Sequence, residues 1–182
     1  MKERLPDYAR DLRINLGAIA SSTVLTPAQA WVVAVASAVT ARNPELVAAV
    51  CEDAASVVGP EVIDAGRAAA SIMGMTNVYY RFLHFTGEKY QQMPARLRMQ
   101  GLGKPGIDHL DFELACLAAS AIAGCERCVT SHDTSVIDRG GSPEQIQEAV
   151  RIAAIVHGAA IALEAGHSGS SASGNAPAAL KS

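Results

Sequence analysis

Two cysteines separated by two residues are the clearest sign of chemistry in this sequence. Cys125 and Cys128 follow Gly124, at the predicted N-terminus of a helix. The free N–H groups at a helix N-terminus stabilise a thiolate and lower the pKa of a thiol placed there. If the first turn is helical, this spacing also brings the two sulfur atoms within reach of each other. The pair is therefore suited to reversible disulfide chemistry.

A histidine and a glutamate can serve this pair as proton carriers. His132 lies four residues after Cys128 on the same face of the predicted helix, so its imidazole can take the thiol proton. Glu113 lies twelve residues before Cys125, on a helix that is otherwise apolar. A helical hairpin would return this carboxylate to the CxxC turn, where desolvation favours a proton relay.

Interpretations of these residues that involve no redox catalysis remain open. The CxxC pair could be structural, or it could bind zinc, although a closed zinc site needs four ligands and only Cys125, Cys128 and His132 are local. Glu113 could complement the dipole at the start of its helix. Arg127, inside the motif, is either a solvated charge or a cation that lowers a thiol pKa.

Helices are the elements that must position these groups. Of the 182 residues 34 are alanine, and 49% are hydrophobic but only 4% aromatic, which favours helices packed through small side chains. Capping and termination signals predict helices at about 3–16, 27–41, 45–57, 60–73, 75–86, 110–123, 126–138 and 143–163. No alternating strand pattern remains, so we predict an all-α fold.

A faint repeat divides the chain into two halves. A shift of 83 residues aligns helix starts within 27–86 with those within 110–165, which predicts two three-helix halves. Only the second half carries the CxxC pair and its histidine. We predict a single domain over 1–165 and a flexible tail over 166–182. Cys51 and Cys116, outside the motif, are interpreted as small core residues.

Charge and hydropathy limit the compartment and the partners. A net charge of −3 with 18% charged residues argues against a nucleic-acid binder. The N-terminal residues are charged where a signal peptide needs an apolar core, and the apolar run 28–41 is too short to cross a bilayer. We expect a cytoplasmic protein with no membrane or nucleic-acid partner, whose cysteines rest as thiols.

The segment FELACLAASAIAGCERCVTSHD resembles the alkyl hydroperoxide reductase AhpD family, within the carboxymuconolactone decarboxylase-like group. LPDYARDLRINL, TARNPEL, ASIMGMTNVYYRF and EAVRIAAIVHGAAIALE extend the resemblance to about residues 3–165. CxxC alone is a weak signal. CxxCxxxH with an upstream glutamate and IMGMTNVYYR is a specific one.

The resemblance implies an AhpD-like helical fold, usually homotrimeric, and an antioxidant alkyl hydroperoxidase without a bound cofactor. Its dithiol would regenerate the peroxiredoxin AhpC, or reduce a hydroperoxide directly but more weakly. Dihydrolipoyl groups on a 2-oxo acid dehydrogenase component, supplied through dihydrolipoamide dehydrogenase, would then reduce it again. The alternatives are a stand-alone hydroperoxidase with another thiol reductant, and a non-catalytic zinc-binding or redox-sensing module.

The resemblance also implies a role for each residue of the site. Cys128 would become the sulfenic acid or the mixed disulfide with AhpC, and Cys125 would be the proton donor and resolving thiol of a Cys125–Cys128 disulfide. His132 would act as the base and Glu113 as its proton relay. Family members have a histidine where this chain has Arg127, and a guanidinium can stabilise a thiolate but cannot shuttle protons.

Overall fold

The regular elements of residues 2–170, the part of the chain that the computed structural model describes, are all helical. The prediction of an all-α fold is confirmed. Three short 3-10 turns and eight α-helices follow in the order η1 (Lys2–Arg4), η2 (Asp7–Ala9), α1 (Arg10–Ile19), α2 (Pro27–Ala41), α3 (Pro44–Ala55), α4 (Pro60–Thr86), η3 (Gly87–Tyr90), α5 (Gln100–Gly103), α6 (His109–Ala123), α7 (Glu126–Asp138) and α8 (Pro143–Ser170).

Local capping explains why several helices begin where the sequence predicts. The hydroxyl of Thr26 accepts the N–H of Gln29, whose side-chain oxygen accepts the N–H of Thr26, so α2 starts with a complete capping box. Asn43 caps α3 through the N–H of Leu46. Ser142 accepts the N–H of Gln145 at the start of α8. A proline follows each cap directly.

One predicted helix boundary is wrong. The sequence analysis ends one helix at 73 and begins another at 75, but α4 runs without a break from Pro60 to Thr86. Gly74 lies in its interior, and a Cβ added there would meet no atom within 4 Å. A single helical glycine costs only about 1 kcal/mol relative to alanine. The burial of Met73, Thr76 and Asn77 on both sides of it outweighs that cost.

The ends of the chain also differ from expectation. In place of one helix over 3–16, two 3-10 turns precede α1, because Pro6 is extended and cannot lie inside a helix. At the other end α8 continues past residue 165 to Ser170. The rest of the predicted tail, 171–182, lies outside the described residues.

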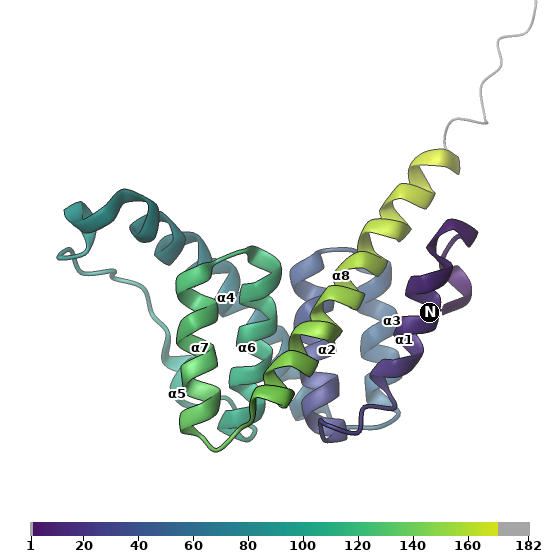
Figure 1. The fold of residues 1–182 in the computed structure, drawn as a ribbon, viewed down its shortest axis with the longest axis horizontal. Coiled ribbons are helices and arrows are strands. Elements are labelled where there is room, and N and C mark those ends of the chain that lie inside the picture. The colour runs from purple at the N-terminus through teal and green to yellow at the C-terminus, as the bar shows by residue number, and fades with distance from the viewer. Residues whose placement is uncertain (1, 171–182) are drawn as a thin grey trace, which may run out of the picture.

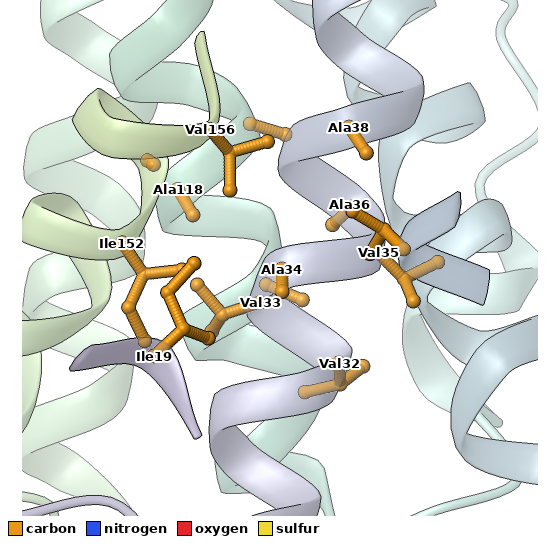
Figure 2. Packing of buried hydrophobic residues seen from close by; sticks show 14 of the residues in the cluster. Ile19, Val32, Val33, Ala34, Val35, Ala36, Ala38, Ala118, Ile152 and Val156 are labelled. Carbon is orange, nitrogen blue, oxygen red and sulfur yellow. The ribbon is translucent and has the colours of Figure 1, made fainter. Parts of the chain in front are cut away.

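Helix α2 is the centre of the core and packs against α4, α6 and α8. Figure 1 shows α8 crossing diagonally in front of α2 and α6. In Figure 2, Val33 lies on the side of α2 that faces Ile19 and Ile152, while Val35 points to the other side. The contact with α4 is close because Gly66 lies there, where a Cβ would stand 2.8 Å from Val35.

The helices in the two parts of the chain have similar lengths in the same order. Helices α2, α3 and α4 have 15, 12 and 27 residues, and α6, α7 and α8 have 15, 13 and 28. Between the two sets, the chain passes through η3 and α5, neither of which the sequence predicts. In Figure 1, α5 lies beside the lower end of α7.

The last helix is apolar as well as long. Residues Pro143–Gly166 have the length and hydropathy of a membrane-spanning segment. Half of the most apolar window is nevertheless buried inside the protein, where α8 packs against α2 and α6. This burial is typical of the core helix of a globular domain.

Candidate redox site

The CxxC motif begins at a tight turn between α6 and α7. Gly124 ends α6 with a left-handed φ of 67°, and the N–H of Cys125 donates to the carbonyl of Ser120 at 3.2 Å. The guanidinium of Arg81, from α4, donates to the carbonyl of Ala123 at 2.6 Å. Cys125 therefore becomes the N-cap of α7, as the sequence predicts for the start of this helix.

The two cysteines of the motif are joined by a disulfide. Their Cα atoms are 5.3 Å apart, because Cys125 caps the helix and Cys128 lies in its first turn. Both are buried, with Cys125 1% and Cys128 6% exposed. Of the two, it is Cys128 that lines a neighbouring pocket. Cys128 is therefore the cysteine of the pair that a small molecule in that pocket would meet.

His132 and Glu113 meet beside this pair. Nδ1 of His132 lies 2.6 Å from Oε2 of Glu113, and the two side chains are 13% and 11% exposed. The hairpin of α6 and α7 produces this contact across 19 residues of sequence. His132 lies one helical turn after Cys128 and lines the same pocket. The structure thus brings together all four residues that the sequence singled out.

An arginine also reaches this glutamate. Nε of Arg139 lies 3.8 Å from Oε1 of Glu113, opposite the oxygen that pairs with His132. Arg139 is the residue at which α7 ends. The sequence predicts that a helix ends at 138 and gives no role to Arg139. The one available signal was an arginine two turns after His132, on the same side of the helix.

Arg127 projects from the motif to an aromatic ring. Its guanidinium carbon lies 5.3 Å from the centre of the Tyr80 ring, which belongs to α4. This is a cation–π contact. Arg127 is exposed, and like Tyr80 it lines the pocket beside Cys128. No local pattern points to Tyr80, because the contact joins helices that are distant in sequence.

The pocket beside Cys128 has a volume of about 320 Å³. Met73, Tyr80, Met99 and Leu102 form apolar parts of its wall, and Ser131 and His132 contribute polar groups. A larger cavity of about 530 Å³ lies between α1, α2 and α3, next to Trp31. No cysteine lines that cavity. The smaller pocket is the one that combines space with a sulfur atom and a proton carrier.

Hydrogen bonds of buried polar groups stabilise the turn that precedes Cys125. The hydroxyl of Ser120 donates to Oδ1 of Asn77 at 3.0 Å, while the carbonyl of Ser120 accepts the N–H of Cys125. Asn77 is only 2% exposed. Single residues of this kind carry no recognisable spacing in sequence, and the sequence analysis missed both.

The other two cysteines lie apart from this chemistry. Cys116 is fully buried in α6, where burial and the charge of Glu113 raise the pKa of its thiol well above the ordinary value. This agrees with its interpretation as a core residue. Cys51 is partly buried against the core, with its sulfur 3.6 Å from Nη2 of Arg67. Among the described residues, no group of three or more His, Cys, Asp or Glu side chains could hold a metal ion.

Comparison with known proteins identifies the family of this chain. Residues 88–166 match the Carboxymuconolactone decarboxylase family. A protein from Anaeromyxobacter dehalogenans (strain 2CP-C) named "Alkyl hydroperoxide reductase AhpD" is 53% identical over 92% of this chain and 91% of its own length. A protein of the same name from Gluconacetobacter diazotrophicus is 49% identical over 98% of this chain and 97% of its own. The chain therefore belongs to the alkyl hydroperoxide reductase AhpD family, within the carboxymuconolactone decarboxylase group.

Proposed function

We propose that this protein is an antioxidant dithiol oxidoreductase that reduces alkyl hydroperoxides and regenerates the peroxiredoxin AhpC. The observation that carries the proposal is the position of Cys128. Its sulfur is disulfide-bonded to Cys125, lines the pocket, and lies one turn from His132, which Glu113 holds at 2.6 Å. The name that the relatives share, alkyl hydroperoxide reductase, agrees with this chemistry.

Peroxide reduction would begin from the dithiol. His132, with Nδ1 bound to Glu113, takes the Cys128 proton at its other ring nitrogen. The thiolate attacks the terminal oxygen of the hydroperoxide, so an S–O bond forms and the O–O bond breaks. The alkoxide that leaves takes a proton and departs as the alcohol. Cys125 then attacks the sulfenic acid at Cys128 and releases water, which restores the disulfide.

The same pair of sulfur atoms would serve the protein partners. A dihydrolipoyl group, carried by a 2-oxo acid dehydrogenase component, transfers two electrons to the disulfide and becomes cyclic lipoyl. Dihydrolipoamide dehydrogenase recycles the lipoyl group. The dithiol then reduces the disulfide of oxidised AhpC through a mixed disulfide at Cys128, the sulfur that lines the pocket. No cofactor needs to remain bound, and such thiol exchange suits a reducing cytoplasm.

A coupled assay tests this proposal. The full-length protein is mixed with lipoamide, dihydrolipoamide dehydrogenase, NADH and an alkyl hydroperoxide, with and without AhpC. We expect NADH consumption that AhpC accelerates and that both Cys128→Ser and Cys125→Ser abolish. Cys51→Ser is the matched control, because this thiol lies next to Arg67 and outside the pocket. Normal turnover in the two CxxC variants would refute the proposal.

The same assay separates two rivals. A stand-alone hydroperoxidase would turn over with dithiothreitol but gain nothing from AhpC or lipoamide. A zinc-binding or redox-sensing module would contain metal in the purified protein, or would form its disulfide without turnover. Metal analysis together with thiol titration before and after peroxide distinguishes that rival.

We further propose that the protein is a homotrimer. Met75, Val78, Phe82 and Phe85 are exposed on α4 at spacings of three and four residues, so they form one apolar helix face. Such a face is suited to contact between copies of the chain. Sedimentation equilibrium of the wild type, with Phe85→Asp as the comparison, tests the proposal. A monomeric wild type would contradict it.

A further inference from the structure

The walls of the pocket beside Cys128 indicate the kind of molecule that it admits. Met73 and Tyr80 come from α4, while Met99 and Leu102 come from α5 and the residue before it. Gly101 allows α5 to approach α4, because a Cβ there would stand 2.8 Å from Ile72. A volume of about 320 Å³ is at the small end for ligand pockets. The pocket is therefore suited to a compact apolar body, such as a short alkyl chain or one aromatic ring.

The same pocket has a cation without a carboxylate partner. Arg127 lines it, and within the described residues Arg127 makes no ion pair. Glu113 pairs with His132, and Glu126, which pairs with His84, lines a separate pocket that Arg127 also borders. No acidic side chain lines the pocket. The wall of the pocket thus contains the positive charge of Arg127 and no acidic side chain.

The contact with Tyr80 orients the guanidinium of Arg127 so that its N–H donors stay available for a ligand. The guanidinium lies over the ring at 5.3 Å, which engages its face. The N–H donors lie at the edge of the guanidinium, and they remain available for a planar anion. Carboxylates are the anions that match this geometry through two parallel hydrogen bonds.

We propose that the preferred hydroperoxides of this protein carry a carboxylate, which Arg127 binds while the hydroperoxide group meets Cys128. The proposal rests on the proposed function and adds a substrate class to it: compact apolar hydroperoxides with an anionic end. The redox step is the one given above, in which the thiolate takes the terminal oxygen and the alcohol leaves. The carboxylate is not changed in the reaction, and its binding orients the substrate.

A matched pair of substrates tests this directly. The reduced full-length protein is mixed in single-turnover experiments with 4-(2-hydroperoxypropan-2-yl)benzoic acid or with its methyl ester, and loss of thiols is followed. We expect the wild type to react about fivefold faster per unit concentration with the acid, as expected for one partly exposed charged contact. Arg127→Gln should bring this ratio to about one, and Arg127→Lys to an intermediate value. The ratio is the readout because a change in thiolate reactivity affects both substrates equally.

Controls and a binding experiment separate this inference from the proposed function. Arg67→Gln removes an exposed arginine that pairs with Asp64 outside the pocket, and it should leave the ratio unchanged. Calorimetry with the product, 4-(2-hydroxypropan-2-yl)benzoate, on the disulfide form should show binding that Arg127→Gln removes. Equal reaction of acid and ester, or a ratio that survives in Arg127→Gln, overturns the inference and leaves the peroxidase proposal standing. Selective binding of the product without thiol oxidation by any hydroperoxide supports the carboxylate site and overturns the peroxidase.

Discussion

The carboxylate of Glu113 lies 2.6 Å from Nδ1 of His132, across the hairpin of α6 and α7. Because both side chains are nearly buried, the carboxylate fixes the imidazole with Nδ1 as the hydrogen-bond donor. The other ring nitrogen, Nε2, is then the one that can accept a proton. Since His132 and Cys128 line the same pocket, this pair links the acid of α6 to the sulfur of α7.

Removal of the Glu113 charge should slow thiol oxidation without loss of the fold. In Glu113→Gln the amide can occupy the same space, but it no longer stabilises a protonated His132. We expect kcat/KM for an alkyl hydroperoxide to fall by roughly 10- to 100-fold, the lower range for a general acid–base contribution. His132→Gln should cost at least as much. The double variant should be no slower than His132→Gln alone, because the two residues act as one unit. Additive losses would contradict this coupling.

The turn before the motif should be more sensitive to alanine than the interior of α4. A Cβ at Gly124 or at Gly74 would meet no atom within 4 Å, so the two sites differ only in backbone conformation. Gly124 has a φ of 67°, where alanine costs about 1 kcal/mol or more. Gly74 is helical, where alanine gains up to about 1 kcal/mol. Urea unfolding should therefore show opposite changes for Gly124→Ala and Gly74→Ala. Changes of the same sign would refute this account of the turn.

Cys116 should be inert in the native protein. Burial, followed by the charge of Glu113, raises the pKa of its thiol, so the thiolate is absent at neutral pH and the sulfur is inaccessible. After reduction, brief treatment with iodoacetamide at pH 7.5 should leave Cys116 unmodified, as measured by mass spectrometry of peptides. In urea the same thiol should react fully. Native labelling of Cys116 at the rate of Cys51 would contradict its place in the core.

Stability should depend on pH through Asp111, a half-buried residue in the first turn of α6. Burial of Asp111, together with the charge of Asp108, raises the pKa of its carboxyl, although a hydrogen bond from Gln29 opposes the shift. The folded state therefore binds the proton more tightly than the unfolded state, and stability falls as pH rises from the ordinary pKa of 3.8 through the raised one. Asp111→Asn removes this dependence.

The variant should therefore gain stability relative to the wild type as pH increases from 4 to 7. Urea unfolding at several pH values measures this difference. Asp64→Asn is the control, because that carboxylate is exposed and pairs with Arg67 at the surface. A constant difference between Asp111→Asn and the wild type across this range would show that the carboxyl titrates alike in both states.

The sequence alone determined the features that depend on neighbouring residues. Thr26, Asn43 and Ser142 mark helix starts because each cap bonds to a backbone N–H three residues later. The CxxC disulfide at a helix start is local in the same sense, since it needs only one turn of α7. Short-range rules sufficed for most helices and for the position of the CxxC pair at a helix start.

Only the tertiary structure decided which groups from other helices surround that pair. The contacts of Arg139 with Glu113 and of Arg127 with Tyr80 join helix surfaces whose relative placement depends on how the core packs. Gly74 remains helical for the same reason, because burial of its neighbours outweighs a local preference to break. Leu102, which forms part of the pocket wall, lies in the connection between α4 and α6, where the sequence has no hydrophobic periodicity. Packing between distant segments, which no local pattern encodes, placed Cys128 beside its cavity and its charged neighbours.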